Sequence, residues 1–483
     1  MNEEQLNTNQ KALRINLDKA KYGTCAEIGA GQEVARLFFR VGGASQTVAK
    51  TMSAYDMTVS DSIYGQADRY VSRQRLQSML DHEYALVIER LDAKRGGETE
   101  FFAFANTVTT CSYTGKGEGH GWLGLRFQAA PRQRPSEVII HVRMLDHDIV
   151  REQEALGIVG LNLIYGAFYH GKAPLKLISS LMDGLTSNRI EVDMIRFSGP
   201  AFAGVDNRLM ALQLVEQGLA EATMFTADGE NVIPSEILYR KPVLIERGSF
   251  RPLTNPMLEM LERSHELFVK ESGMEGETPV TLMEMTLRQL HVGDCIDHGD
   301  FLERVDTLST LHRPVLISNF LRYHRLVHYI GRHTQKMIGL PLGLARVRAI
   351  LDETYYTDLE GGLMESLGQL FRNGVKLYAY PWRNHETGQV FTIDSLEVPP
   401  KVRHLYTHLI ENGFIGEIAN YTPEYLDINS NIVLDKLKSG DASWEQMVPP
   451  PIAEIIKTKR MFGYREAREA VTELETVEVP EYA

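Results

Sequence analysis

The chain has 483 residues, 43% of them hydrophobic, and a net charge of −13. This length exceeds what one hydrophobic core usually serves, so we expect two or three domains. No apolar run approaches the roughly 20 residues of a membrane helix, so we expect no membrane-spanning segment. The acidic balance and the scattered Lys and Arg residues argue against a nucleic-acid partner. Because the N-terminus is polar and mixed in charge, without the apolar core of a secretion signal, we expect a cytoplasmic protein.

The first 135 residues are the less regular part of the chain. Helical periodicity predicts helices at Gln32–Phe39 and Arg73–Leu91. Two apolar segments, Thr99–Thr110 and Gly121–Gln128, read as antiparallel strands joined by the glycine-rich loop 114–121. The pattern favours an α+β unit in this half of the chain.

From about residue 136, short apolar runs alternate with helical periodicity. The runs predict strands at Val138–Met144, Ile190–Phe197, Pro242–Glu246, Val280–Met285, Val315–Asn319, Met337–Leu340 and Val375–Tyr380. The intervening segments predict helices at Glu152–Tyr169, Arg208–Gly218, Pro256–Lys270, Asp300–Leu311, Leu321–His333, Leu344–Thr354 and Gly362–Asn373. Continuous apolar strands that alternate with helices are typical of parallel sheets covered on both faces.

The fold class that follows is α/β, with an N-terminal α+β unit over residues 1–240 and an α/β domain over residues 241–397. A C-terminal helical tail over residues 398–483 is predicted from helices at Val402–Asn412 and Ala453–Met461. Self-association into a homo-oligomer is an expectation from the size and class of the protein alone.

The turn after the strand at Pro242–Glu246 offers groups that suit an anion. Gly248 permits close approach of the backbone, and Arg251 supplies a planar cation that matches phosphate oxygens. Ser249 and Thr254 supply hydroxyl groups. Because a helix follows, its N-terminal N–H groups and dipole would add to the attraction.

The same turn also has the residues of an ordinary strand-to-helix connection. Asn255 is a favourable N-cap, and Pro256 suits the first position of a helix. An anion site and a well-capped turn therefore both remain open at this point.

The sequence GSFRPLTNPMLEML that starts at Gly248 resembles the first motif of the nucleotidylyltransferase superfamily, in particular the nicotinamide/nicotinate mononucleotide adenylyltransferases. That motif reads Gly-Ser-Phe-x-Pro-x-Thr-Asn-x-His after the first strand of a Rossmann-like domain. The matching residues are Gly248, Ser249, Phe250, Pro252, Thr254 and Asn255. Met257 stands where the family carries histidine, and a methionine cannot donate a hydrogen bond to phosphate.

The resemblance implies a Rossmann-like parallel sheet over residues 241–397 and a nucleotide-binding function. It implies adenylyl transfer from ATP to a pyridine mononucleotide, as in NAD biosynthesis, with a small-molecule nucleotide as partner and Mg²⁺ as cofactor if transfer occurs. The family's second motif, Ile-Ser-Ser-Thr-x-x-Arg, has its nearest counterpart in Ile317–Arg322, one residue short, which makes Arg322 a secondary candidate. The catalytic residues stay unassigned.

Two further loops are secondary candidates. Gly29 and Gly31 form a Gly-x-Gly before a helix, which suits either a phosphate or a tight turn. Lys116 and His120 lie in the glycine-rich loop and add titratable donors, although a hairpin tip without chemistry has the same composition. We expect no metal site, since the histidine pair His324 and His328 lacks the glutamate of a zinc-binding His-Glu-x-x-His helix.

Three functions are therefore open. The chain is a nucleotide-binding adenylyl transferase, or a catalytically inactive relative with an assembly or regulatory role, or an enzyme whose site lies in the N-terminal unit. Met257 and the large N-terminal unit that the resemblance does not explain both motivate the second, whereas the third would place the site around Glu27–Gln32, Lys116–His120 and Arg143.

Overall fold

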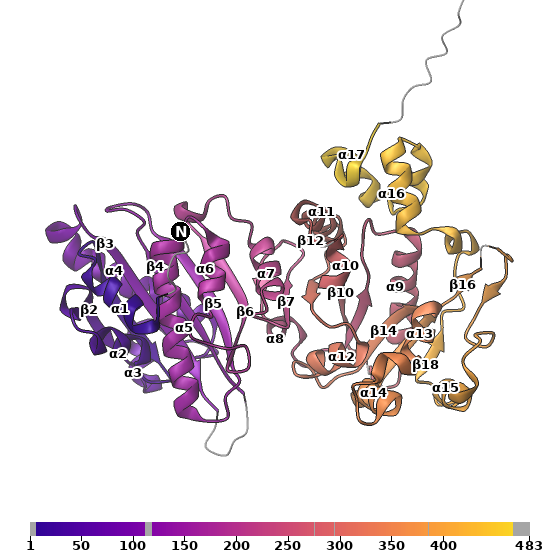
Figure 1. The fold of residues 1–483 in the computed structure, drawn as a ribbon, viewed down its shortest axis with the longest axis horizontal. Helices are drawn as coiled ribbons and strands as arrows, with labels where there is room; N and C mark the ends of the chain where they lie inside the picture. The colour runs from indigo at the N-terminus through magenta and orange to yellow at the C-terminus, as the bar shows by residue number, and fades with distance from the viewer. Residues whose placement is uncertain (1–5, 112–117, 275, 294, 385, 467–483) are drawn as a thin grey trace, which may run out of the picture. The chain divides into compact units, whose positions relative to one another are not determined.

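The computed structural model describes residues 6–111, 118–274, 276–293, 295–384 and 386–466 (Figure 1). It divides into two compact units. Unit 1 comprises Met1–Tyr239, Thr286–Arg288 and Pro314–Leu321, and unit 2 comprises Arg240–Met285, Gln289–Arg313 and Arg322–Ala483. No helix of the described residues is long and apolar enough to cross a membrane.

Unit 1 is built on a six-stranded mixed sheet in the order β2-β1-β3-β4-β5-β6. Its strands are β1 (Lys21–Ile28), β2 (Val48–Met52), β3 (Glu100–Thr109), β4 (Gly119–Phe127), β5 (Ser136–Met144) and β6 (Ile190–Ser198). β1 runs parallel to both β2 and β3, whereas β3, β4, β5 and β6 pair antiparallel. The predicted antiparallel pairing of the two N-terminal strands is thus confirmed.

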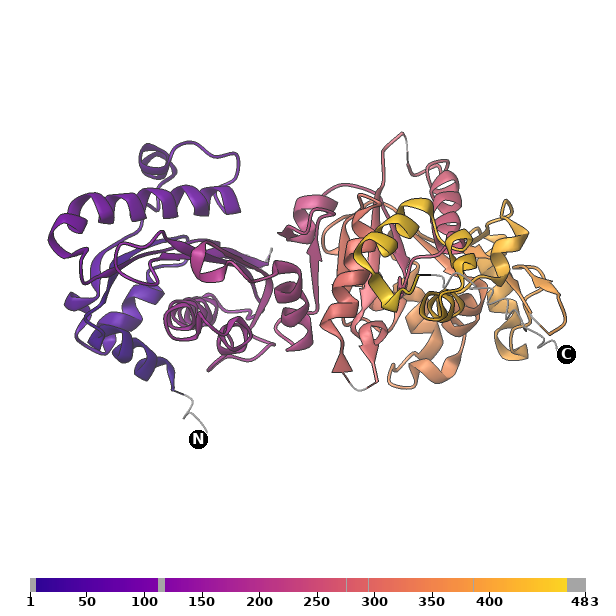
Figure 2. The same ribbon diagram turned by 90° about the horizontal axis from the view of Figure 1, so that it is seen from above.

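Helices cover both faces of this sheet, so that unit 1 has three layers (Figure 2). One face carries α1 (Thr8–Leu17), α2 (Glu33–Arg40), α5 (Ile149–His170), α6 (Pro174–Ser180) and α7 (Asn207–Glu216), which share a large apolar core with the strands. The other face carries α3 (Met57–Tyr64) and α4 (Arg73–Arg95), whose apolar side chains pack on smaller clusters. Every residue of β5 is buried as a result.

This burial explains one wrong prediction. The continuous apolar run at β5 was expected to belong to a parallel sheet, but β5 pairs antiparallel with both β4 and β6. A strand that helices cover on both faces is apolar along its whole length whichever way its neighbours run. The apolar run therefore indicates that the strand is buried, and it carries no information on the direction of the neighbouring strands.

Three further strands of unit 1 lie outside its six-stranded sheet. β7 (Ala222–Phe225) pairs antiparallel with β8 (Asn231–Val232) and with β13 (Val315–Ser318), and α8 (Pro234–Leu238) follows β8. β13 joins unit 1 from a distant part of the chain, so unit 1 is discontinuous in sequence.

Unit 2 contains a Rossmann-like parallel sheet with its strands in the order β18-β15-β14-β9-β10. These strands are β9 (Val243–Arg247), β10 (Val280–Thr286), β14 (Ile338–Gly343), β15 (Val375–Tyr380) and β18 (Ile415–Glu417). The predicted parallel sheet is confirmed for β9, β10, β14 and β15, and the chain is an α/β protein. The strand predicted at Val315–Asn319 is instead β13, which pairs antiparallel with β7, and β18 lies in the segment that was predicted to be a helical tail.

Helices of ordinary length connect and surround these strands. They are α9 (Asn255–Phe268), α11 (His298–Ser309), α12 (Tyr323–Gly331), α13 (Leu344–Ile350), α14 (Gly362–Leu370), α15 (Arg403–Glu411), α16 (Ser430–Ser439) and α17 (Pro450–Lys459). Short elements lie between them: α10 (Leu287–Leu290), the pair β11 (His291–Val292) and β12 (Cys295–Ile296), and the pair β16 (Trp382–Arg383) and β17 (Val390–Phe391).

Candidate functional site

The loop between β9 and α9 lies at the carboxyl end of the parallel sheet of unit 2. From β9 the chain passes through α9 to β10 on one side, while β14 pairs with β9 on the other side. Such a reversal of strand order leaves a crevice beyond the strand ends, where α/β proteins commonly bind ligands. Residues 248–254 therefore occupy the position in which this fold places a ligand loop.

The first turn of the loop is tight. Gly248 donates its N–H to the Glu284 carbonyl at 3.1 Å, and a Cβ at Gly248 would lie 2.7 Å from the Phe250 ring. Phe250 is fully buried and has a φ of 46°, in the left-handed region. Glycine is required at 248 because any side chain there would collide with the buried ring.

This turn leaves backbone donors available. The N–H groups of Ser249, Phe250 and Arg251 have no hydrogen-bond acceptor among the residues that the structure describes. Consecutive N–H groups around a left-handed residue form a concave nest that suits an anion. These three N–H groups are unpaired backbone donors of the loop among the described residues.

The Arg251 guanidinium is held by a buried carboxylate. Its Nε donates to Asp300 on α11, and Asp300 also accepts from Nε of Arg304 at 2.7 Å. Arg304 in turn donates to the Ser249 carbonyl at 3.1 Å. Two guanidinium groups therefore share one carboxylate, and the Asp297 and Glu303 carboxylates also interact electrostatically with this cluster.

The end of the loop differs from the expected cap. Thr254 is the N-cap of α9 and Asn255 is its first residue, so the prediction of Asn255 as N-cap is wrong by one position. The Asn255 side chain donates instead to the Gln446 carbonyl at 2.8 Å, and its N–H donates to Met447 at 2.9 Å. The Gln446 carbonyl, in the C-terminal part of the chain, therefore binds the Asn255 side chain that was expected to cap α9.

Sequence reasoning missed this C-terminal contribution to the site. Ser430, in the first turn of α16, donates its hydroxyl to the Pro252 carbonyl at 3.0 Å, and Asn429 caps the same helix. A second helix N-terminus therefore lies beside the loop. The only signal in the sequence was an Asn-Ser pair before a helical stretch. Such a pair is a common helix cap, and it does not indicate which distant residues the helix end will contact.

Thr254 and Met257 have different surroundings. The Thr254 hydroxyl is buried and has no hydrogen-bond partner among the described residues. Met257 is half-buried on the first turn of α9. An unpartnered buried hydroxyl is uncommon and calls for a ligand or a water as its explanation.

Beneath the loop, β9 and β10 bury acidic groups. Arg247 donates to Glu284 through two nitrogens, and both side chains are almost fully buried. The Glu246 carboxyl is also buried, and its Oε2 has no partner among the described residues. Desolvation raises the pKa of the Glu246 carboxyl well above its ordinary value.

Arg322 is engaged elsewhere. It precedes α12 and forms a two-pronged ion pair with Asp358, at 2.5 and 2.9 Å. This pairing raises the pKa of Arg322 and lowers that of Asp358. Among the described residues, Arg322 makes no hydrogen bond to the loop 248–254.

The Gly29 and Gly31 turn binds a carboxylate of its own chain. Glu27 accepts from the N–H groups of Val34 and Ala35, at 3.2 and 2.9 Å, in the first turn of α2. Burial raises the pKa of Glu27 to about 7. The helix end that the sequence offered to phosphate is thus already bonded to Glu27.

The remaining candidates, Lys116 and His120, were predicted to lie in the glycine-rich loop. Lys116 falls outside the described residues. His120 lies on β4 and its Nδ1 is 3.2 Å from Nε2 of His141 on β5. No group of three His, Cys, Asp or Glu side chains in the described residues is arranged to hold a metal ion.

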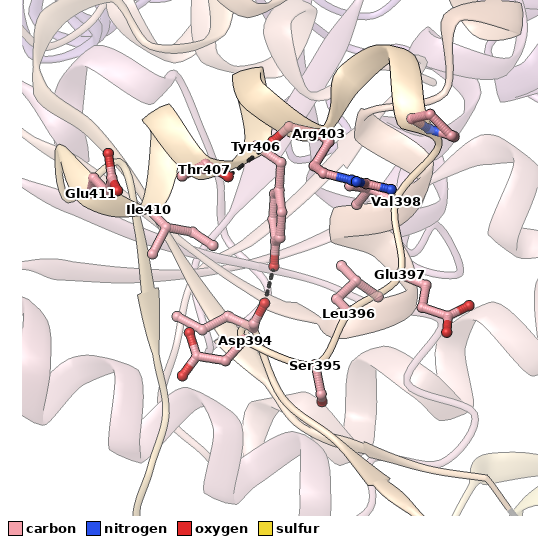
Figure 3. Close-up of a pocket in the computed structure, with 12 residues that line it drawn as sticks. Asp394, Ser395, Leu396, Glu397, Val398, Arg403, Tyr406, Thr407, Ile410 and Glu411 are labelled. Carbon is pink, nitrogen blue, oxygen red and sulfur yellow. Dashed lines mark hydrogen bonds between the residues drawn. The ribbon is translucent and has the colours of Figure 1, made fainter.

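A pocket of about 720 Å³ lies between α15 and the segment 393–400 of unit 2 (Figure 3). The Tyr406 ring stands in it and its hydroxyl donates to the Ile393 carbonyl at 2.7 Å. Burial raises the pKa of Tyr406 to about 12. Leu396 and Val398 supply apolar lining while Arg403 and Glu397 supply charges of both signs, so the pocket has no dominant chemistry.

Comparison with known proteins gives little further information. No protein-family model and no curated protein matches the chain. Among solved structures it is similar to the competence/damage inducible protein CihA from Agrobacterium tumefaciens, with 17% identity over 34% of this chain and 97% of that one, and a TM-score of 0.24. It is also similar to a competence-damaged protein (CinA) superfamily protein from Enterobacter cloacae, with 13% identity over 35% and 96% and a TM-score of 0.25. Likenesses this low carry no argument about function.

Proposed function

We propose that unit 2 binds a nucleotide through the loop 248–254 and transfers an adenylyl group from ATP to a pyridine mononucleotide. The observation that carries this proposal is the nest of three unpartnered N–H groups at Ser249–Arg251, at the topological switch point of a parallel sheet. The resemblance of Gly248–Asn255 to the adenylyltransferase motif supports the same ligand.

Each group in the loop has a definite task in this proposal. The nest and the Arg251 guanidinium would hold phosphate oxygens, while the Arg251–Asp300–Arg304 cluster keeps the cation in place. The mononucleotide phosphate attacks the α-phosphorus of ATP, and pyrophosphate leaves with the electron pair of the broken bond. Positioning and charge neutralisation do most of the catalytic work in such a transfer.

Magnesium would enter with the nucleotide. Asp300, the carboxylate closest to the loop in these contacts, is occupied by two arginines and offers no open set of ligands. The ATP phosphates would therefore supply most of the metal's ligands, and bound Mg²⁺ would neutralise charge on the leaving pyrophosphate.

Isothermal calorimetry of the full chain in millimolar Mg²⁺ tests the proposal with ATP, NAD and nicotinamide mononucleotide. We expect binding of at least one of them, weakened about tenfold or more in Arg251→Gln because one charge-assisted contact of roughly 1.5–3 kcal/mol is lost. Arg372→Gln, which changes an exposed arginine of unit 2, is the matched control and should bind as the wild type does. Absence of heat with all three ligands would refute nucleotide binding.

Met257 motivates the alternative, a nucleotide-binding protein without transferase activity. An assay for pyrophosphate release separates the two. Turnover by the wild type would exclude the inactive alternative, whereas turnover only after Met257→His would show that the loop binds its ligand but lacks the donor that the chemistry needs.

A further inference from the structure

Three side chains of unit 1 form a hydrogen-bonded row across β4, β5 and β6. His120 Nδ1 lies 3.2 Å from His141 Nε2, and His141 Nδ1 lies 2.6 Å from an Asp193 oxygen. His141 and Asp193 are each 3% exposed, whereas His120 is only half-buried. The row therefore connects a buried carboxylate to the protein surface.

An irregularity in the sheet aims the carboxylate. His141 pairs with Met194 while the next residue, Val142, pairs with Val192, so Asp193 is an extra residue in β6. A bulge of this kind breaks the alternation of side chains and re-aims the additional one. Here it allows Asp193 to reach His141, whose ring also packs against Trp122 with 4.9 Å between ring centroids.

The hydrogen bonds determine where the ring protons lie. An ionised carboxylate only accepts, so His141 carries its proton on Nδ1 and its neutral Nε2 accepts from His120. His120 then carries its proton on Nδ1, and its Nε2 lone pair is the acceptor at the end of the row that His120, the half-buried member, forms. A proton that arrives there can be passed on from ring to ring.

Charge does not rest favourably on His120 itself. Desolvation, with the neighbouring His141, lowers the pKa of His120 to about 4. The Arg143 guanidinium contributes to this lowering and is itself bonded to Glu191 and Glu118. Glu236 and Arg73 also lie in this electrostatic neighbourhood. His141, in contrast, faces the Asp193 carboxylate directly, at 2.6 Å.

We propose that Asp193, His141 and His120 form a second catalytic site, a proton relay in which His120 Nε2 accepts a proton from water or from a ligand hydroxyl. As Nε2 of His120 gains this proton, its Nδ1 proton passes to Nε2 of His141. One proton is taken up, His120 ends neutral with its proton on Nε2, and His141 becomes an imidazolium paired with Asp193. The deprotonated oxygen is then free to attack an electrophilic carbonyl carbon.

Nitrogen-15 NMR of the histidine-labelled full chain tests the relay directly. When the row takes up a proton on acidification, we expect that proton to lie on His141 while His120 changes from the Nδ1–H to the Nε2–H tautomer. In Asp193→Asn both changes should be lost, because the charge that stabilises the imidazolium is removed. An imidazolium that forms first on His120, or a His120 that keeps its tautomer in the wild type, would overturn the proposal.

Hydrolysis of 4-nitrophenyl acetate tests the chemistry. Water gives its proton to His120, its oxygen bonds to the acetyl carbon, the ester C–O bond breaks, and 4-nitrophenolate leaves with the electron pair. We expect His120→Gln and Asp193→Asn each to lower the protein-dependent rate at least tenfold, and His147→Gln, at an exposed histidine of the same unit, to leave it unchanged. A rate that survives His120→Gln would refute the catalytic assignment.

Discussion

At the scale of single residues, buried acids decide much of the electrostatics. Glu246 lies on β9 and is buried away from solvent, and one of its carboxyl oxygens has no hydrogen-bond partner among the described residues. Its pKa is raised by desolvation, so the folded state binds a proton that the unfolded state releases above about pH 4.5. Stability therefore falls as the pH rises above that value.

Replacement of this carboxyl checks the sign. Glu246→Gln cannot ionise, so the variant should be more stable than the wild type at pH 9, by on the order of 1–3 kcal/mol, with a smaller difference at pH 5. Urea denaturation across this pH range measures the effect. The control is Glu262→Gln, at an exposed position on α9, which should follow the wild type. If the free energies of unfolding of Glu246→Gln and of the wild type change with pH in the same way, the buried-acid interpretation is wrong.

At the scale of elements, the strand β1 and the helix α2 are joined by a turn that depends on glycine. Gly29 has a φ of +104°, and a Cβ there would lie 1.8 Å from the Val108 carbonyl oxygen on β3. Gly42 has a similarly positive φ of +78°, but nothing lies within 4 Å of its Cβ position. Alanine substitution at Gly42 therefore measures the cost of the positive φ alone, whereas substitution at Gly29 adds the cost of a steric collision.

We expect Gly42→Ala to cost about 1 kcal/mol, from the positive φ alone. Gly29→Ala should cost roughly 3 kcal/mol or more, because β3 or the turn must also move. Thermal denaturation of both variants gives the comparison. Equal losses would show that the turn can shift away from Val108 and that the close approach does not constrain unit 1.

Several elements were predictable and some details of them were not. The helix at Arg73–Arg95 and the strand at Val375–Tyr380 have the apolar periodicity that their burial requires, so the sequence alone located them. Strand direction at β5 was not predictable, because helices on both faces hide it. The cap of α9 was displaced by one residue because Gln446, far along the chain, binds the Asn255 side chain.

At the scale of the whole molecule, unit 1 is not continuous in sequence. β13, at Val315–Ser318, pairs residue for residue with β7 at Ala222–Phe225. A fragment of residues 1–239 lacks this strand and would expose the hydrogen-bonding edge of β7. The length and composition of the chain gave no indication that the strand at Val315–Ser318 belongs to unit 1.

Hydrogen exchange measures the consequence. In the full chain the amides of β7 that bond to β13 should be protected, whereas in the fragment 1–239 they should exchange at least tenfold faster and the fragment should aggregate more readily. The amides of β4, which lies between β3 and β5 in both molecules, serve as the internal reference. Unchanged protection of β7 in the fragment would show that this edge is stable without β13.

The candidate sites show the same division. The sequence identified the loop at Gly248–Asn255 by composition, since glycine, hydroxyl and arginine side chains on a strand-to-helix turn suit an anion. It could not show that Asp300 holds Arg251 or that Ser430 reaches Pro252, because these partners are 49 and 178 residues away. It singled out His120 but not His141 and Asp193.

Local order was thus determined by the sequence itself: the apolar periodicity that makes most strands and helices, the parallel α/β character of β9, β10, β14 and β15, and the composition of the turn at Gly248–Asn255. Tertiary structure alone decided which charges meet. Hydrogen bonds and ion pairs act over a few ångströms, and only folding brings β4, β5 and β6, or α9, α11 and α16, within that range.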